Sequence, residues 1–289
     1  MLFEVKELSE VLLSRRVGID LLELEERQKM EKNDRHFVLV HGPCHGAWCW
    51  YKVASLLKEA GYKVTTLDMA GSGVHPKQLH EIHTISDYID PLMQFMASIL
   101  PEEKVVLVGH STGGVCISAA MEMFSYKISV AVFVNAIIPS FDLSLTTIME
   151  ECFRRVDDHM DIQYMFDDGN NKPPTSMLFG PNFLSSKLYQ HSPPEYLLLA
   201  TTLMRPSRLF FDPILTSSAV VTKKKFGSVH RVHIICENDK VLKEDFQRWM
   251  IEKNPMDEVM SIIGSDHMVM FSKPEELCSC LKHISDKYS

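Results

Sequence analysis

Short apolar runs alternate with amphipathic stretches along most of the chain. Between the apolar runs, apolar residues recur at helical spacing near residues 48–57, 85–100, 113–123, 244–253 and after Pro274. The apolar runs have the length and the Val/Ile/Leu content of buried strands, and they cover residues 36–40, 62–68, 105–108, 128–134, 231–235 and 259–263. Strands that alternate with helices are typical of βαβ units. The pattern predicts an α/β fold with a mostly parallel sheet and helices on both faces.

The alternation breaks between about residues 140 and 225. This stretch has no regular succession of strands and helices and is rich in proline (Pro173, Pro174, Pro181, Pro193, Pro194, Pro206 and Pro213). A long insertion between two sheet strands is typical of a lid or cap over an active site. We therefore predict one α/β domain over residues 36–289, with a cap insertion at about residues 140–225.

The first 35 residues precede the first predicted strand. They lack the continuous apolar segment of a signal peptide, and their acidic residues argue against an organelle transit peptide. Their leucine spacing is compatible with a marginal amphipathic helix that binds a partner. The simpler interpretation of residues 1–35 is a dispensable N-terminal extension.

The charge balance narrows the range of partners. Of the 289 residues, 45% are hydrophobic and 24% are charged, and the formal net charge is −8. An acidic chain does not favour phosphate backbones or anionic lipids, and the basic run at residues 223–225 is short enough to be a solvated loop. No stretch approaches the roughly 18 apolar residues of a membrane span. We expect a small-molecule substrate, with no nucleic acid and no membrane.

Cysteine and histidine spacings argue against disulfides and metals. Seven cysteines is an odd number, and they are scattered along the chain. This usage predicts reduced, buried thiols in a cytoplasmic protein. Cys278 and Cys280 are separated by a single residue, and no second cysteine pair accompanies them. The spacing of His75, His80 and His83 does not match a metal-ligand set either. We therefore expect no metal site.

A Gly-x-Ser-x-Gly pentapeptide occupies residues 109–113, with the sequence Gly-His-Ser-Thr-Gly. A predicted strand precedes it and a helical pattern follows it, which is the context of a nucleophile elbow. Small residues flank the serine because neighbouring Cβ atoms would collide in so sharp a turn. Ser111 is the candidate nucleophile, and the N–H group of Thr112 is a candidate oxyanion donor. The alternative is a glycine-rich turn that only packs the strand on the helix.

A serine hydroxyl needs a base to remove its proton and a carboxylate to orient that base. In α/β-hydrolases the acid and the histidine follow the serine along the chain. Asp239 and His267 each come just after one of the last two predicted strands. Glu237 and Asp266 are rival acids, but the first lies nearer its strand and the second adjoins the histidine. We predict a triad of Ser111, Asp239 and His267.

Several further segments occur in a pattern known from one protein family. They are residues 36–42 (His-Phe-Val-Leu-Val-His-Gly), 44–48 (Cys-His-Gly-Ala-Trp), 104–111 (Lys-Val-Val-Leu-Val-Gly-His-Ser), 236–240 (Cys-Glu-Asn-Asp-Lys) and 266–268 (Asp-His-Met), with cap segments at 176–181, 205–206 and 227–229. Together they resemble the plant methylesterase and hydroxynitrile lyase family. The resemblance runs from about residue 36 to the C-terminus. Family members usually begin near the position of Met30, so residues 1–29 look extra.

The resemblance implies an α/β-hydrolase fold with a helical cap and no cofactor. It assigns Ser111, His267 and Asp239 as nucleophile, base and acid, and it allows a homodimer, which family members often form. The implied substrate is a small ester or cyanohydrin. The leading hypothesis is a carboxylic ester hydrolase that acts on a plant specialised metabolite, such as the methyl ester of an indole alkaloid. Decarboxylation would follow if the acid is β to a carbonyl or an imine.

Two positions depart from the family pattern. The residue after the His-Gly dipeptide is the family's other oxyanion donor, but here it is Pro43, which has no backbone N–H. Losing one such donor costs about 10²–10³ in kcat, so the N–H of Cys44 is a candidate substitute. Thr112 replaces a larger apolar residue and enlarges the pocket.

The sequence around this loop suggests candidate substrate-binding residues and two alternative functions. His45, Trp48 and Met268 are candidate substrate-binding residues. Because Pro43 weakens the oxyanion hole, a lyase or cyclase that uses His267 as an acid–base is the first alternative. Cyanohydrin cleavage is disfavoured, because lyases of the family tend to carry Lys where Met268 stands. The second alternative is a ligand-sensing receptor on the same fold.

Overall fold

The computed structural model describes residues 35–169, 171–212, 216 and 219–288. Apart from Arg35, the predicted N-terminal extension lies outside the described residues. The helices are α2 (Tyr51–Glu59), α3 (Ile85–Ser98), α4 (Gly113–Phe124), α5 (Leu145–Arg155), α6 (Pro181–Phe183), α7 (Pro194–Leu203), α8 (Glu244–Lys253), α9 (Val269–Ser272) and α10 (Pro274–Tyr288). Short 3₁₀ or π turns are η1 (Ala47–Trp50), η2 (Leu79–Glu81), η3 (Ser125–Lys127), η4 (Leu184–Leu188) and η6 (Phe226–Ser228).

Six strands form the central sheet in the order β2-β1-β3-β4-β8-β9, and every neighbouring pair is parallel. They are β1 (His36–Val40), β2 (Lys63–Leu67), β3 (Val105–Ser111), β4 (Ile128–Ala136), β8 (His230–Cys236) and β9 (Glu258–Ile262). Each coincides with one of the six apolar runs in the sequence. The predicted α/β fold with a parallel sheet is confirmed.

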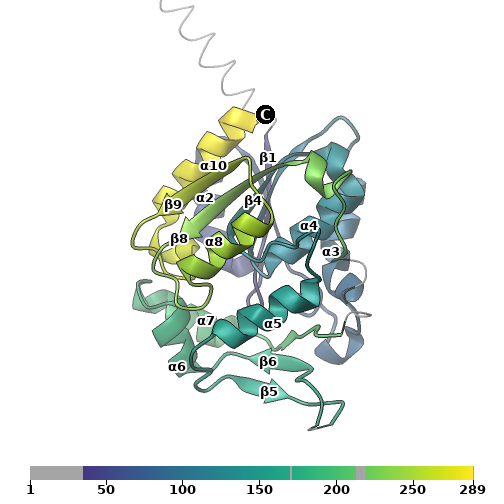
Figure 1. The fold of residues 1–289 in the computed structure, drawn as a ribbon. Coiled ribbons are helices and arrows are strands. Elements are labelled where there is room, and N and C mark those ends of the chain that lie inside the picture. Colours follow the sequence, from purple (N-terminus) through teal and green to yellow (C-terminus); the bar gives the residue numbers. More distant parts are fainter. Residues whose placement is uncertain (1–34, 170, 213–215, 217–218, 289) are drawn as a thin grey trace, which may run out of the picture.

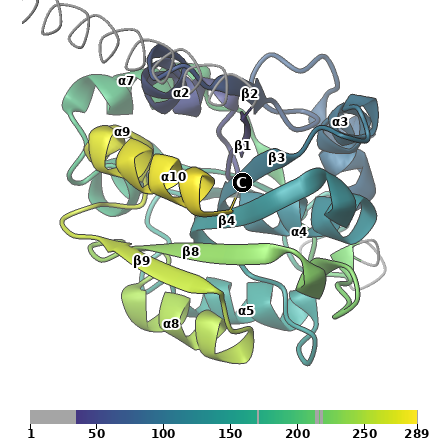
Figure 2. The same ribbon diagram turned by 90° about the horizontal axis from the view of Figure 1, so that it is seen from above.

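Helices cover both faces of this sheet (Figure 2). The side chains of α3, α4 and α8 form one apolar layer with alternate strand residues such as Leu107 and Phe133. Those of α2, α9 and α10 form the other layer with the intervening residues, such as Val108 and Val134. Buried on both sides, the central strands read as continuous apolar runs rather than as an alternating pattern.

Between β4 and β8 the chain leaves the sheet and lies across its carboxyl edge, at the bottom of Figure 1. This cap contains α5, α6, η4 and α7. It also contains a three-stranded antiparallel sheet of β5 (Gln163–Met165), β6 (Ser176–Leu178) and β7 (Ser207–Arg208). The expectation of a purely helical cap is therefore incomplete. The strands were missed because each has at most three residues, too few to show a period of two.

Candidate active site

Ser111 stands in a strained turn between β3 and α4. Its φ is 54°, in the left-handed region that a nucleophile elbow imposes on its serine. A Cβ added to Gly42 would lie 2.8 Å from Cβ of Ser111, so the loop after β1 approaches the serine more closely than any side chain allows. The Ser111 carbonyl accepts from the N–H of Ile137 at 2.9 Å, which ties the turn to the end of β4.

Asp239 and His267 form a buried acid–base pair. His267 Nδ1 lies 2.7 Å from Asp239 Oδ2, and both residues are almost fully buried. The other carboxylate oxygen, Oδ1, accepts from the N–H of Val241 at 2.6 Å. With Nδ1–H donated to the carboxylate, Nε2 is the imidazole nitrogen left to take a proton. Ser111 and His267 line one pocket, as a nucleophile and its base must.

Asn135, at the end of β4, makes a further contact with this pair. Its side-chain Nδ2 donates to Asp239 Oδ2 and lies 3.2 Å from His267 Nδ1. Asn135 is fully buried, and its φ of 46° is again left-handed, a conformation that Asn tolerates better than most residues. The turn directs the amide toward the acid–base pair, and the carboxylate gains a third hydrogen-bond donor.

The two rival acids have other surroundings. Asp266 Oδ2 accepts from the N–H of His191 at 3.0 Å and from the hydroxyl of Ser192 at 2.9 Å, which joins the last sheet strand to the cap. Glu237 is half-buried, and its backbone N–H is directed to Ile262 of the neighbouring strand. Of the three carboxylates weighed in the sequence, Asp239 is the one in contact with His267.

His110 contacts His267 and holds its backbone in place. Its Nε2 donates to the carbonyl of His267 at 2.8 Å, and the two rings are 4.8 Å apart between centroids. Burial, together with the nearby His267, holds the pKa of His110 well below its ordinary value. His110 is therefore neutral and acts as a hydrogen-bond donor that fixes the backbone beside the candidate base.

The pocket in front of Ser111 lies between the sheet and the cap. It encloses an empty volume of about 650 Å³, including its opening to solvent. Most of its wall is apolar and comes from the cap, including Met149, Phe153, Met177, Phe179 and Phe211. One polar pair, His159 Nδ1 and the Tyr164 hydroxyl, lies in the wall at 2.7 Å separation. A pocket with so apolar a wall suits a small, largely apolar molecule.

The residues considered for the oxyanion hole differ in whether they line the pocket. Pro43 and Thr112 both line the pocket, whereas Cys44 does not appear in its wall. Cys44 is buried with φ 62°, and its thiol contacts the carbonyl of Met177 in the cap. Its carbonyl accepts from the N–H of Arg205. The role of the Cys44 N–H as a substitute donor stays a prediction.

The three candidate binding residues lie behind the pocket wall. His45 Nε2 is 2.7 Å from the Tyr189 hydroxyl, and its Nδ1 is 2.9 Å from the carbonyl of Pro43, so both ring nitrogens are engaged. Trp48 stacks on His45 at 5.3 Å, and Met268 is completely buried. None of the three appears among the residues that line the pocket. His45 joins the loop after β1 to the cap through Tyr189.

Sequence reasoning missed Asn135 and the apolar cap residues. A signal for Asn135 was available, because it is a polar residue at the carboxyl end of a long apolar strand. Ligand sites of open α/β sheets collect at such ends. The cap residues carried no comparable signal, since Met and Phe spacing does not distinguish a pocket wall from a core.

Within the described ranges, no cluster of three or more His, Cys, Asp or Glu side chains is arranged to hold a metal ion. In the same part of the chain, no helix combines the length and the apolar character needed to cross a bilayer.

Comparison with known proteins decides the family. The model described as the alpha/beta hydrolase family matches residues 37–279. The chain belongs to this family. It is 58% identical over 261 residues to methyl jasmonate esterase 1 of Vitis vinifera, and the match covers 90% of this chain and 100% of that protein. It is 45% identical over 257 residues to polyneuridine aldehyde esterase of Rauvolfia serpentina, covering 88% and 97% of the two chains.

A solved structure agrees with these relatives. Tomato methylketone synthase I in complex with 2-tridecanone superposes with a TM-score of 0.85 at 45% identity, over 88% of this chain and 99% of that one. Within the alpha/beta hydrolase family the chain groups with the plant methylesterases, as its motifs indicated. It is an enzyme of the serine-esterase type.

Proposed function

We propose that this esterase hydrolyses methyl esters of small plant carboxylic acids, with Ser111 as nucleophile, His267 as base and Asp239 as its partner. The observation that carries the proposal is the 2.7 Å contact between Asp239 and His267 at a pocket that also exposes Ser111. The same three residues stand in the chain order of α/β-hydrolases.

The reaction follows from these positions. Ser111 Oγ attacks the ester carbonyl carbon while His267 Nε2 takes the hydroxyl proton. The tetrahedral intermediate collapses, and the imidazolium returns the proton to the leaving methoxide, which departs as methanol. Water then attacks the acyl-enzyme by the same route and frees the carboxylic acid. Asp239 keeps Nδ1 protonated and stabilises the imidazolium in both steps.

The oxyanion of the tetrahedral intermediate has few hydrogen-bond donors to stabilise it. We infer that the N–H of Thr112, the residue after Ser111 and the N-cap of α4, receives the developing charge. Pro43 lines the same pocket and has no backbone N–H to donate. We infer slower hydrolysis than in a site with two donors.

The substrate acid is small and largely apolar, in keeping with the pocket wall. Two relatives suggest candidates by their names, methyl jasmonate and an indole-alkaloid ester of the polyneuridine aldehyde type. The higher identity to methyl jasmonate esterase 1 favours the first, while the alkaloid ester remains the hypothesis drawn from sequence motifs. An acid product that is β to a carbonyl would then lose carbon dioxide without further help from the enzyme.

Methanol release tests the proposal. Purified protein is incubated with methyl jasmonate and with a panel of other methyl esters, including alkaloid esters. We expect methanol and the acid in equal amounts, and a loss of at least about 10³-fold in kcat for Ser111→Ala. Ser279→Ala, an exposed serine on α10, is the matched control. Absence of methanol across the panel, or full activity of Ser111→Ala, would exclude the mechanism.

A non-hydrolytic reaction on the same pocket is the second candidate. The observation that favours it is Pro43 in the wall of the pocket that Ser111 lines, because a reaction without a tetrahedral intermediate does not need a second oxyanion donor. A solved relative is named as a synthase rather than as an esterase. Mass spectrometry of alkaloid intermediates with wild type and Ser111→Ala separates the two. A product that forms equally with both proteins and contains no added water supports the second candidate.

A further inference from the structure

A polar pair interrupts the apolar wall of the catalytic pocket, the cavity that Ser111 and His267 line. His159 Nδ1 lies 2.7 Å from the hydroxyl oxygen of Tyr164, and both residues belong to the cap. Apart from the reaction centre, the other described residues of this wall carry no side chain that forms strong hydrogen bonds. The few polar groups of an apolar pocket usually fix the orientation of its ligand. The pair is therefore the place where the cap can recognise a polar group on the substrate acid.

The fold holds both side chains of the pair in place. Tyr164 lies in β5 opposite Met177 of β6, and cross-strand partners point to the same face of a sheet. Met177 also lines the pocket, so the cap sheet directs the tyrosine into it. The ring of Phe153 on α5 lies 4.4 Å from that of His159 between centroids, and the carbonyl of His159 accepts from the N–H of Ile162 at 3.0 Å. The pair is thus a preorganised part of the wall.

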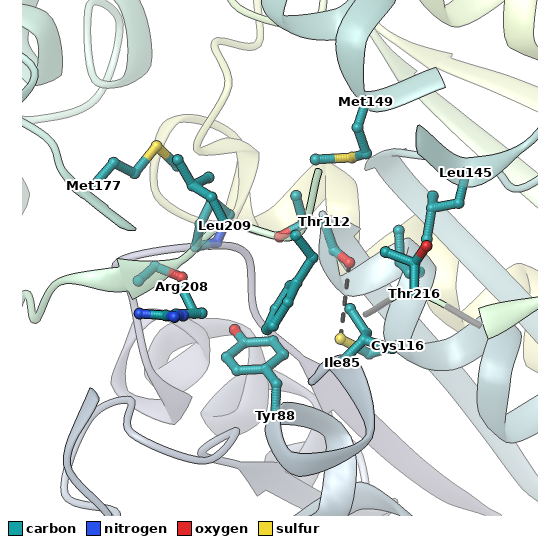
Figure 3. A pocket seen from close by; sticks show the side chains of 14 residues that line it. Ile85, Tyr88, Thr112, Cys116, Leu145, Met149, Met177, Arg208, Leu209 and Thr216 are labelled. Atoms are coloured by element: carbon teal, nitrogen blue, oxygen red, sulfur yellow. Dashed lines mark hydrogen bonds between the residues drawn. The ribbon is translucent and has the colours of Figure 1, made fainter. Parts of the chain in front are cut away.

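A second cavity adjoins the catalytic pocket, and the pair lies outside it. The two cavities share five wall residues, which are Pro43, Thr112, Met149, Met177 and Leu209. Figure 3 shows the last four of these among the side chains around the second cavity. All but Thr112 are apolar, and neither His159 nor Tyr164 lines this cavity. The polar pair therefore marks one region of the catalytic pocket, and the largely apolar shared wall marks another.

The contact within the pair leaves one donor and one acceptor for a ligand. If the Tyr164 hydroxyl donates to Nδ1 of His159, the imidazole keeps Nε2–H as a donor and the phenol oxygen keeps a lone pair. If Nδ1–H donates instead, the phenol O–H is the donor and Nε2 is the acceptor. Burial raises the pKa of Tyr164 to about 12, so the phenol keeps its proton. Among the described residues, neither side chain has a further hydrogen-bond partner.

A hydroxyl group matches this combination. An alcohol or phenol hydroxyl accepts from the donor and donates to the acceptor at the same time, whereas a carbonyl or ether oxygen only accepts. A carboxylate would be buried without a cation, because the described residues that line the pocket include no Lys or Arg. Asp157 and Asp158 directly precede His159, and their charges also disfavour an anion there. The neutral group that satisfies both members of the pair is a hydroxyl.

We propose that His159 and Tyr164 together bind a hydroxyl group on the part of the substrate acid that lies away from the ester. The pair belongs to the cap and Ser111 to the sheet, so the two ends of the acid contact opposite layers of the protein. The substrate class is then the methyl ester of a hydroxy acid in which an apolar segment separates the hydroxyl from the ester carbonyl. The proposal rests on the proposed ester hydrolysis for its orientation, since the ester must reach Ser111.

Matched sets of methyl esters test it. Each set contains one arylalkanoic acid skeleton in a hydroxy, a methoxy and an unsubstituted form, and the ring position and chain length differ between sets. We expect the wild-type kcat/KM to favour the hydroxy ester over the unsubstituted ester by about tenfold at one geometry. The methoxy ester should lack this advantage, because its oxygen cannot donate. A hydroxy-to-unsubstituted ratio of one in every set, or an equal advantage of the methoxy ester, would overturn the proposal.

Two substitutions assign the preference to the pair. His159→Phe keeps a ring against Phe153 and removes both nitrogens, so it should bring the hydroxy-to-unsubstituted ratio close to one. Tyr164→Phe removes only the hydroxyl, and it should lower the ratio with little change for the unsubstituted ester. Tyr126→Phe, at an exposed tyrosine, is the matched control and should keep the wild-type ratio. Thermal unfolding shows whether each variant is folded, and a ratio that neither pair variant lowers would contradict the assignment.

Calorimetry with the free acids keeps this proposal distinct from the proposed hydrolysis. Ser111→Ala is titrated with each hydroxy acid and its unsubstituted partner, alone and combined with Tyr164→Phe. Tighter binding of a hydroxy acid that is lost with Tyr164→Phe supports the pair, even if no ester is hydrolysed. Equal binding of the two acids in every set would overturn the role of the pair, while methanol release from the esters would still support hydrolysis.

Discussion

The side-chain amide of Asn135 donates to Oδ2 of Asp239, the same oxygen that receives Nδ1–H of His267. One carboxylate oxygen thus holds two donors, and the other is held by the N–H of Val241. The carboxylate is fixed in both rotation and position. An acid that only neutralised the histidine would not need this arrangement, whereas one that sets the tautomer and direction of an imidazole does.

Replacing Asn135 should therefore weaken catalysis through the acid–base pair. Asn135→Gly removes the amide and keeps the left-handed backbone free of strain. We expect kcat/KM to fall about tenfold, the size of one hydrogen bond to a charged group. With one donor fewer, the Asp239 carboxylate attracts the imidazolium more strongly, so the acidic limb of the pH–rate profile should move to higher pH.

The pH–rate profile of kcat/KM is the measurement, with Asn171→Gly as a control at an exposed position. A fall in rate with an unmoved acidic limb would mean that Asn135 serves only the packing of β4. A rate equal to that of wild type would show that Val241 and His267 are enough to hold the carboxylate.

The sheet and the elbow could be predicted because their signals are local. Each central strand is buried on both faces, so its whole length is apolar, and the elbow between β3 and α4 needs small residues on both sides of Ser111. The contact between Asp239 and His267 follows from chain order, because parallel strands bring their carboxyl ends to one edge of the sheet.

The pocket wall could not be predicted in the same way. Met149 and Met177 come from separate cap elements that meet only after the cap folds over the sheet. Proximity along the loop after β1 also does not tell which side chains line the pocket. His45 follows Pro43 by two positions, but its ring turns to Tyr189 and away from the pocket. Side-chain direction in a loop depends on tertiary contacts that spacing does not encode.

The close approach of Gly42 to Ser111 predicts a loss of activity for Gly42→Ala. The new Cβ would meet Cβ of Ser111 at 2.8 Å, and one of the two backbones must shift. We expect stability to fall by about 1–3 kcal/mol. We expect kcat to fall by up to about 10²-fold, because the nucleophile is displaced.

Urea unfolding and ester kinetics check both effects. Gly227→Ala is the matched control, because a Cβ there would lie 3.4 Å from Phe141 Cζ in ordinary contact. An active, fully stable Gly42→Ala would show that the loop relaxes without moving Ser111.

Restoring a backbone N–H at Pro43 should accelerate hydrolysis. In Pro43→Ala the N–H returns to a residue that already lines the catalytic pocket. We expect kcat to rise by about 10²-fold with little change in KM, because an oxyanion donor acts mainly in the transition state. Pro76→Ala, in an exposed loop, controls for the removal of a proline. An unchanged kcat would mean that a second donor already acts, and it would remove the support for the non-hydrolytic candidate.

Buried neutral histidines should make the fold sensitive to mild acid. Burial lowers the pKa of His233 to about 4 and that of His45 to about 3, from an ordinary value of 6.5. Below pH 6.5 these two histidines bind protons in the unfolded chain but stay neutral in the folded chain. The free energy of unfolding therefore falls by about 1.4 kcal/mol per pH unit for each histidine as the pH falls from about 6.5 toward 4. Above about pH 6.5 these two histidines cause no such loss.

Urea unfolding at several pH values between these limits measures the slope. His233→Leu removes one of the responsible groups from the core and should reduce the slope by about 1.4 kcal/mol per pH unit, although it also leaves Gln247 without its contact to the ring. His80→Leu, at an exposed position, should keep the parent slope. An equal slope in His233→Leu and the parent would show that the folded protein accepts a proton at His233. The fold would then have to open around β8 to hydrate the ring, because that side chain has no exposed surface in the native state.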